Sequence, residues 1–284
     1  MTKHLDEIIK AAESIPPLPM TAIKLSEVIS RPTVSAADIA EVLQYDPAVT
    51  ANLLRLCSTA YFGFSEKVVS VKDAVVKLGT NEVFQLVMAS TSRKLLNREV
   101  TGYALPPGAL WRQSVGAALS AQKVSRIRGL SRRGMAFTAG LLLDIGKLAL
   151  DKIVDYEFEH LTEKAAEEEI SFVQAEEALL GISHPEMGAR LAESWSLPAE
   201  LVSCIRYHHN PHEAPEEHRE LVSVCHLADL IAITIGFGLG SDGMKYQAEI
   251  DIAEVLHLKA NDFDNLCVDI VTDYSDVKKL FLEN

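Results

Sequence analysis

The sequence contains a small set of carboxylate and imidazole side chains in segments that are otherwise apolar. Asp144 lies within the run AGLLLDIGKLAL, and Asp229 lies within the apolar segment 222–235. Five of the nine histidines fall between residues 184 and 218, among them His184 and the adjacent pair His208 and His209. Imidazole and carboxylate ligands together suit Zn, Fe, Mn or Ni. A metal held between helices is therefore one chemistry that these residues could perform.

Burial makes the two aspartates the residues that most need a partner. The segment around Asp144 is apolar on nearly every helical face, so a helix there would be buried. An unpaired buried carboxylate costs several kcal/mol, so Asp144 needs a cation, a hydrogen-bond donor or a metal. Lys147 is three residues further on and could pair with it on the same helical face. Asp229 poses the same problem.

The histidines are expected at helix ends. His184 precedes a proline and should stand at a helix start. His208 and His209 should lie near a helix C-terminus, because an Asn-Pro pair follows them at 210–211. Adjacent helical residues point about 100° apart. We therefore expect one of the two to face inward and the other to cap the helix or contact solvent.

The segments that must position these residues form a series of predicted helices with short breaks. Ser35 with Asp38 is close to a capping box, and Asp46 before a proline is typical of an N-cap. The first predicted helix follows the turn at 16–19, and the next two begin near Ser35 and Asp46. The later ones span 71–78, 82–96, 109–128, 132–154, 157–168, 172–181, 185–195, 198–209 and 217–236, with two or three short helices to the end. No segment shows sustained strand alternation, so the predicted fold class is all-α.

A polar stretch divides this series of helices. Residues 97–108 are rich in proline and glycine, which favours a boundary there. We predict two packed helical lobes, at 1–100 and 101–240, and a C-terminal helical extension at 241–284. The extension would cover the core or support self-association. The glycine-rich segment 236–245 is expected to be a mobile connection.

Charge argues against one class of partner. The chain has 284 residues and a formal net charge of −13, which opposes non-specific binding to a phosphate backbone. We predict no nucleic-acid partner. The densest basic cluster is expected to be a solvated helical face. It comprises Lys123, Arg126, Arg128, Arg132 and Arg133.

The cysteines and the apolar segments bear on the cellular compartment. Cys57, Cys204, Cys225 and Cys267 are widely spaced with no CxxC pair, so neither a disulfide framework nor a zinc knuckle is predicted. Each is interpreted as a small buried hydrophobic residue. No signal-peptide core is present at the N-terminus, and no apolar stretch is long enough to span a bilayer. A cytoplasmic protein with no membrane partner is expected.

These residues stand in motifs that resemble the HD superfamily of helical metal-dependent phosphohydrolases, and more closely its HDOD branch, the HD-related output domain. The resemblance covers about residues 10–235 and implies that the second lobe is an HD-like helical bundle. The motifs are IPPLP at 15–19, QYDPAVTANLLRLCSTAYFG at 44–63, VSVKDAVVKLG at 69–79, LWRQS at 110–114, AGLLLDIGKL at 139–148, SHPEMGARLAESWSLP at 183–198 and YHHNP at 207–211.

The resemblance implies a metal site that this chain retains only in part. A histidine ligand of catalytic HD enzymes falls on Gln113, and the signature His-Asp pair falls on Leu143 and Asp144. Leucine cannot coordinate a metal, and a two-metal site needs its ligands to fix charge and geometry. The retained positions are Asp144, His184, His208, His209 and Asp229, with Lys147 after the glycine. HDOD proteins are generally regarded as non-catalytic bacterial signalling modules, and the resemblance implies that role.

Three interpretations of the retained residues stay open. They form a hydrogen-bonded network, with Asp144 paired to Lys147 or a histidine. They hold one divalent transition metal (Fe, Mn, Ni or Zn), with Gln113 as a weak oxygen ligand. Or they retain metal-dependent phosphohydrolase or phosphodiesterase activity, with Lys147 assisting. A non-catalytic module would instead bind a signalling protein or a small ligand through its surfaces or a pocket between the lobes, and self-association also stays open.

Overall fold

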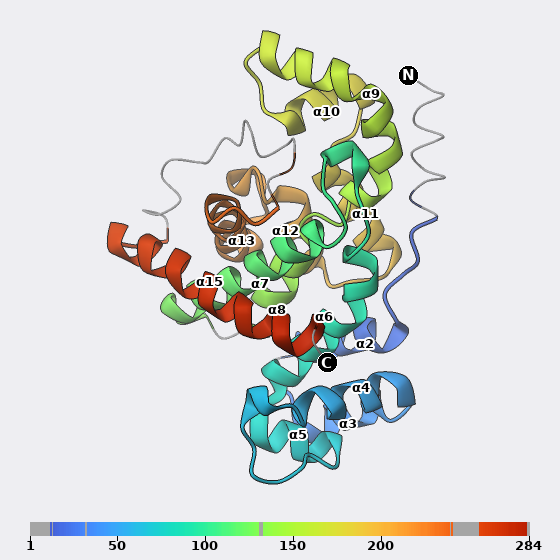
Figure 1. The fold of residues 1–284 in the computed structure, drawn as a ribbon, viewed down its shortest axis with the longest axis vertical. Helices are drawn as coiled ribbons and strands as arrows, with labels where there is room; N and C mark the ends of the chain where they lie inside the picture. Colours follow the sequence, from blue (N-terminus) through green and yellow to red (C-terminus); the bar gives the residue numbers. More distant parts are fainter. Residues whose placement is uncertain are drawn as a thin grey trace.

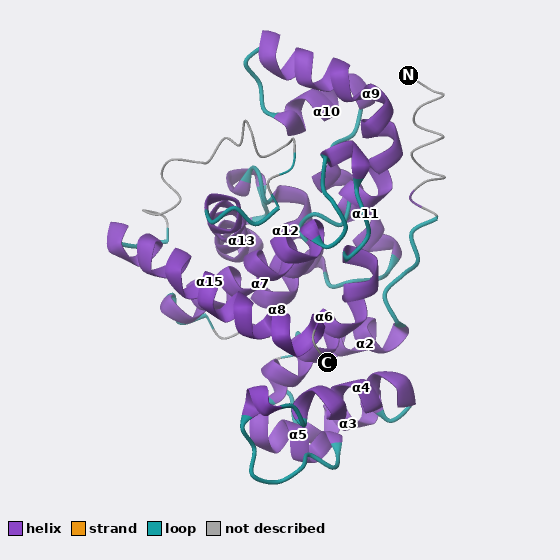
Figure 2. Ribbon diagram, viewed as in Figure 1, coloured by secondary structure: helices purple, strands orange, loops and turns teal. Residues whose placement is uncertain are grey.

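Helices account for all of the regular structure in the part of the chain that is described. The computed structural model describes residues 12–282, apart from 13, 32, 131, 132, 239 and 241–255. Within that range the only strand-like contact is a bridge between Val100 and Leu105 (Figure 2). The predicted all-α fold class is confirmed. None of the described helices is long and apolar enough to cross a membrane.

The N-terminal helices begin where local sequence signals place them. Ser35 and Asp38 form the predicted capping box, and Asp46 Oδ1 accepts the backbone N–H of Val49 at 3.0 Å. The helix expected at 82–96 begins two residues earlier. The elements are α2 (Met20–Ile29), α3 (Ala36–Leu43), α4 (Pro47–Cys57), the 3-10 helix η1 (Ala60–Phe62), α5 (Val71–Leu78) and α6 (Thr80–Leu96).

The remaining helices surround α7 (Figure 1). This helix packs against α6, α8, α13 and α15, and most of its residues are buried. The elements are η2 (Thr101–Tyr103), α7 (Ala109–Ile127), α8 (Arg133–Leu142), α9 (Lys147–Glu167), α10 (Phe172–Leu180), α11 (His184–Ser194), α12 (Ala199–Tyr207), η3 (Pro211–Glu213), α13 (Glu216–Thr234) and α15 (Ala260–Leu282).

The predicted continuous helix at 132–154 is wrong. The chain turns at 143–146, and α9 then continues to Glu167, taking in the separate helix expected at 157–168. Gly146 lets this turn pack directly on the start of α11. A Cβ atom at Gly146 would lie 2.0 Å from the carbonyl oxygen of His184 and 2.6 Å from the backbone nitrogen of Gly188. Only glycine permits this approach, which brings Asp144 beside His184.

The C-terminal part also differs from the expectation of short helices. α15 is a single helix of 23 residues, which lies across α7 and α13 in Figure 1. Most of the glycine-rich segment 236–245 lies outside the described residues, as do Arg132 and the side chain of Arg133 from the basic cluster. Lys123 of that cluster pairs with Asp269 and Asp273 of α15.

Helix α6 joins the two predicted lobes. It packs against α2, α4 and α5 on one side and against α7 and α8 on the other. The buried apolar side chains form one continuous cluster that extends from Ile15 to Phe281. The division into 1–100, 101–240 and 241–284 stays a prediction. Cys57, Cys204 and Cys225 are buried as expected, whereas Cys267 is half-buried, and none of the four forms a disulfide.

Candidate functional site

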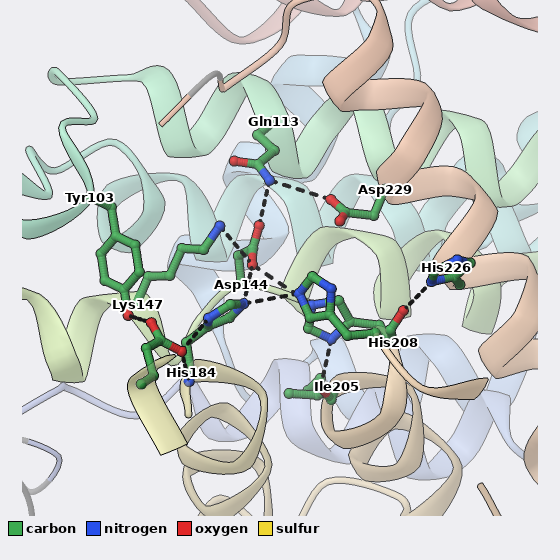
Figure 3. Close-up of polar contacts among 11 residues, drawn as sticks. Tyr103, Gln113, Asp144, Lys147, His184, Ile205, His208, His226 and Asp229 are labelled. Atoms are coloured by element: carbon green, nitrogen blue, oxygen red, sulfur yellow. Dashed lines mark hydrogen bonds and ion pairs between the residues drawn. The ribbon is translucent and has the colours of Figure 1, made fainter. Parts of the chain in front are cut away.

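Polar side chains from several helices meet at one buried place beside the turn at 143–146 (Figure 3). The turn supplies Asp144, and each neighbouring element supplies one or two more side chains. We call the set the central polar cluster: Gln113 from α7, Asp144 from the turn, Lys147 from the start of α9, Glu176 from α10, His184 from the start of α11, His208 and His209 after α12, and Asp229 from α13.

Asp144 lies at the centre of this cluster. Its Oδ1 is 3.0 Å from the Lys147 ammonium, and its Oδ2 accepts a 2.6 Å hydrogen bond from Gln113 Nε2. Burial alone would raise the pKa of Asp144, but the nearby charges of Lys147, His184 and His208 outweigh it and lower the pKa. The predicted pairing with Lys147 is therefore present, and the carboxylate is ionised.

Gln113 joins the two buried carboxylates of the site. Its Nε2 donates to Asp144 and also to Asp229 Oδ1, at 3.3 Å. Asp229 thus joins the cluster through the amide of Gln113. Gln113 stands where the resemblance places a histidine ligand. The other departure, Leu143, is 1% exposed and belongs to the hydrophobic core. The amide at position 113 serves both carboxylates through Nε2, whereas its Oε1 is buried without a hydrogen-bond partner among the described residues.

Glu176 orients His184 and was missed by sequence reasoning. Glu176 Oε2 accepts the backbone N–H of His184 at 2.8 Å and its ring Nδ1–H at 2.9 Å, and Tyr103 donates to Oε1. Burial opposes protonation of His184, but the Glu176 carboxylate raises its pKa. Helical spacing could have identified Glu176, since it lies four residues from both Phe172 and Leu180 on the apolar face of α10.

The tautomer of His208 is fixed by the backbone. Its Nδ1 is 2.8 Å from the carbonyl oxygen of Ile205, which can only accept, so Nδ1 carries the proton and Nε2 carries a lone pair. That buried Nε2 has no hydrogen-bond partner within the described part of the chain and lies 3.9 Å from Asp144 Oδ1. Burial lowers the pKa of His208 to about 3. His226, also missed from the sequence, donates to the His208 carbonyl.

We expected one of His208 and His209 to face inward and the other to cap the helix or contact solvent; His208 does cap α12 through the Ile205 carbonyl, but the two rings do not diverge. Both rings face His184: His209 Nε2 is 3.2 Å from His184 Nε2, and the His208 and His209 ring centroids are 4.1 Å apart. α12 ends at Tyr207, and His209 lies in the turn that follows the C-cap residue His208. Burial first, and then the neighbouring positive groups, hold the pKa of His209 well below its usual value.

Three imidazoles and one carboxylate of the cluster lie close enough together to form a donor set for a metal ion. Ligand nitrogens of His184, His208 and His209 lie within 4.8 Å of one another, and His184 Nε2 is 3.4 Å from Asp144 Oδ1. A carboxylate that holds a ligating histidine by its other nitrogen, as Glu176 holds His184, is common around metals. The unpartnered His208 Nε2 completes a donor set that fits one transition-metal ion.

The same residues do not fit a two-metal centre. Leu143 offers no ligand atom, the Lys147 ammonium already contacts the Asp144 carboxylate, and Gln113 presents a donor to both carboxylates. Two of the clustered histidines in the sequence lie elsewhere. His218 bonds Ser203 at 2.8 Å, and His212 lies in η3, so neither contributes to the central polar cluster.

Solvent access to the cluster is small. Asp144 is 4% exposed, Lys147 is 1% exposed, and His184 and His208 are fully buried. Gln113 is covered by the chain after α13, because a Cβ atom at Gly238 would lie 2.4 Å from Gln113 Oε1. The arrangement can therefore stabilise the meeting point of these helices, and it lies away from bulk solvent.

The chain matches one protein family over more than half of its length. The family model of the HDOD domain matches residues 15–211. A curated protein of Treponema pallidum (strain Nichols) is 26% identical over 230 residues, which is 81% of this chain and 44% of that protein. The chain thus spans less than half the length of that curated relative.

Solved structures show the same fold. An HDOD domain protein from Geobacter sulfurreducens has a TM-score of 0.74 at 25% identity, covering 99% of both chains. A protein from Shewanella amazonensis SB2B, described as a candidate phosphohydrolase, has a TM-score of 0.66 at 25% identity and covers 96% of both chains. A protein from Marinobacter aquaeolei VT8, described as a candidate signal transduction protein, has a TM-score of 0.74 at 24% identity, covering 98% of this chain and 65% of that one.

Proposed function

The chain belongs to the HDOD domain family, and from this premise we propose that it is a non-catalytic regulatory module of the bacterial cytoplasm. It acts by binding a signalling protein or a small ligand, without nucleic acid or membrane as partners. One observation carries the proposal. Lys147 and Gln113 already satisfy the central carboxylate that a hydrolase would use to hold a metal.

The charge balance of the site supports a structural role for the cluster. A buried carboxylate is stable only when it is paired and hydrogen-bonded, and Asp144 has both an ammonium at 3.0 Å and an amide donor at 2.6 Å. The neutral amide at Gln113 and the apolar side chain at Leu143 remove two imidazoles from the set that the resemblance implies. We therefore interpret the central polar cluster as a network that holds α7, α9, α11 and α13 together.

The burial of the cluster also argues against catalysis. A phosphoester is a charged substrate that needs a path to the reacting groups and room beside them. Asp144 and Lys147 are almost fully buried, and His184 and His208 are completely so. Catalysis would require these helices to separate, which would break the hydrogen bonds that hold the cluster.

A second candidate function is a metal-dependent phosphohydrolase with an incomplete ligand set. The observation that favours it is His208 Nε2, a buried lone pair without a partner among the described residues. His184, His208, His209 and Asp144 would hold one Fe, Mn, Ni or Zn ion. Such an ion would supply Lewis acidity and would lower the pKa of a water molecule. Lys147 would have to leave Asp144 in order to contact a phosphate.

Metal content and hydrolysis together separate the two candidates. The full chain is incubated with Mn²⁺, Fe²⁺, Ni²⁺ or Zn²⁺ and desalted. Its metal content is then measured by mass spectrometry, and its phosphodiesterase activity is measured with bis(p-nitrophenyl) phosphate as the substrate. The wild type is compared with His208→Ala, Asp144→Ala and the control His218→Ala, which removes a histidine outside the cluster. We expect the wild type to hydrolyse this substrate no faster than the Asp144→Ala variant does, with any of the four metals.

The outcomes are distinct. Turnover that Asp144→Ala and His208→Ala abolish, but His218→Ala preserves, would overturn the non-catalytic proposal. Stoichiometric metal that only the two cluster variants lose, without turnover, would assign the cluster a structural or sensing metal and leave the regulatory role intact.

A further inference from the structure

The residues directly after α13 form a short strap against one side of the central polar cluster. α13 ends in a Schellman motif, in which the backbone N–H of Phe237 donates to the carbonyl oxygen of Ala232 at 2.9 Å. Gly236 and Gly238 have φ angles of +78° and +68°, a backbone conformation that glycine adopts readily. The two glycines therefore turn residues 236–238, which we call the strap, back onto α7.

The strap lies directly on Gln113 of the cluster. A Cβ atom at Gly238 would lie 2.4 Å from Gln113 Oε1 and 2.5 Å from Gln113 Cβ, so the backbone of the strap contacts this side chain. Gln113 and its acceptor Asp229 are each only 2% exposed. The strap thus keeps solvent away from the amide that joins the two buried carboxylates.

Phe237 holds the strap against α7. Gly116 stands in the interior of α7, where a glycine weakens a helix and so calls for a packing reason. A Cβ atom there would lie 2.7 Å from Phe237 Cδ2, so the missing methyl group makes room for the ring. Arg112, one turn earlier on α7, has its Cζ 5.9 Å from the ring centroid, which is within cation–π distance. The ring is 9% exposed and fixes the position of the strap.

Helix α15 supplies the other aromatic contact of the Phe237 ring. The ring centroids of Phe237 and Tyr274 are 4.6 Å apart, and their planes are tilted by 58°, which is a favourable arrangement for an aromatic pair. Lys123 of α7 holds this part of α15 in place, since it pairs with Asp269 at 3.0 Å and with Asp273 at 3.1 Å. The position of α15 and the position of the strap are therefore linked through one aromatic contact.

We propose that α15 controls solvent access to the central polar cluster through Phe237. While α15 is docked on α7, Tyr274 and the space at Gly116 hold the ring, and the strap covers Gln113. When α15 leaves α7, the ring loses its aromatic partner, the strap is released, and Gln113 and Asp229 become accessible. A binding event that displaces α15 would therefore change the cluster without touching it.

This inference goes beyond the proposed function, because it concerns the cover of the cluster and holds for either of the two candidate functions. Its test requires neither a bound metal nor hydrolysis. A failure of the strap mechanism is therefore distinguishable from a failure of the regulatory proposal.

Hydrogen exchange of the Gln113 side-chain amide measures the cover directly. The full chain is transferred into D₂O, and NMR follows the decay of the Gln113 Nε2 signals, which are identified by their absence from the spectrum of Gln113→His. The backbone amides of Ala118 on α7 and Cys225 on α13, both fully buried, report the opening of the helices themselves. We expect the Gln113 amide to exchange at least tenfold faster in Tyr274→Ala, with both backbone amides within twofold of their wild-type rates.

Three variants assign the effect to the aromatic contact. Tyr274→Phe keeps the ring and should exchange like the wild type. Gly116→Ala adds a methyl group whose closest contact would be the Phe237 ring, while alanine favours the helix, so it should accelerate exchange of the Gln113 amide at least threefold. Tyr156→Ala removes a tyrosine that is 81% exposed on α9 and should change nothing.

Three results would overturn the proposal. These are unchanged Gln113 exchange in Tyr274→Ala, equal acceleration in Tyr274→Ala and Tyr274→Phe, or an acceleration of the Ala118 and Cys225 amides by the same factor as Gln113. The last result would mean that the whole fold opens rather than the strap. Circular dichroism establishes that each variant is folded. Should Tyr274→Ala fail to fold, unchanged Gln113 exchange in Gly116→Ala would overturn the proposal instead.

Discussion

Replacing Lys147 by methionine would remove the only ammonium group that the structure places against Asp144 within its described residues. Methionine keeps the apolar length of the side chain and leaves Asp144 buried at 4% exposure. At 3.0 Å and an effective dielectric constant of about 20, the attraction between two full charges is about 5.5 kcal/mol. Gln113 and His184 still contact the carboxylate, so part of its stabilisation remains. We expect Lys147→Met to lower the free energy of unfolding by about 3–5 kcal/mol.

The double variant Lys147→Met/Asp144→Asn tests whether charge causes the loss. The asparagine is neutral, so the second substitution should recover about 2–3 kcal/mol relative to Lys147→Met alone. Urea unfolding monitored by circular dichroism gives both values, and an unchanged slope with urea concentration shows that the unfolded states are comparable. Lys164→Met is the control, because Lys164 forms an exposed ion pair with Glu168 and its loss should cost about 0.5 kcal/mol or less.

Two results would refute this reasoning. A loss below about 1 kcal/mol for Lys147→Met would mean that the ammonium is not the counter-charge of Asp144. A double variant no more stable than Lys147→Met would mean that the cost comes from packing around the lysine stem rather than from an uncompensated carboxylate.

Three further variants test other residues of the cluster and the turn beside it. Glu176→Gln should cost about 2–3 kcal/mol in urea unfolding and weaken any Zn²⁺ binding at least tenfold, because His184 loses its carboxylate acceptor. Gly146→Ala should cost more than about 3 kcal/mol or prevent folding, since the methyl group would meet the start of α11. His208→Gln should flatten the loss of stability as pH falls from about 6.5 toward 4. The folded-state pKa of about 3 means that the unfolded chain binds the extra proton there, which costs up to about 1.4 kcal/mol per pH unit. Equal slopes in wild type and variant would contradict the buried, neutral His208.

Local signals in the sequence predicted most of the helices. Ser35 with Asp38 and Asp46 with its following proline determine their own helix starts, because capping depends on residues within one turn. The turn at 143–146 could not be predicted in this way, since the surrounding sequence is apolar and helical in pattern. The turn packs, through Gly146, on a segment that begins some forty residues later, and such a contact cannot be read from the local sequence.

The sequence predicted which residues form the site better than it predicted how they are arranged. Apolar surroundings identified Asp144 and its pairing with Lys147, because the cost of burying a charge can be read from a sequence. The position of His209 could not be predicted, since it depends on where α12 ends. Glu176 was overlooked because it stands beside the exposed Glu177, and a glutamate in a helix is ordinarily on the solvent-facing side.

The double contact of Glu176 with His184 links the chemistry of the imidazole to the architecture of α11. Ser183 makes no side-chain cap, and the same carboxylate oxygen accepts both the first backbone N–H of the helix and the ring N–H. Any mutation of Glu176 would therefore disturb a helix start as well as a ring orientation. A lineage that had lost hydrolysis would still be under selection for folding at this position. The orientation of His184 can thus outlast the activity for which such an arrangement is suited.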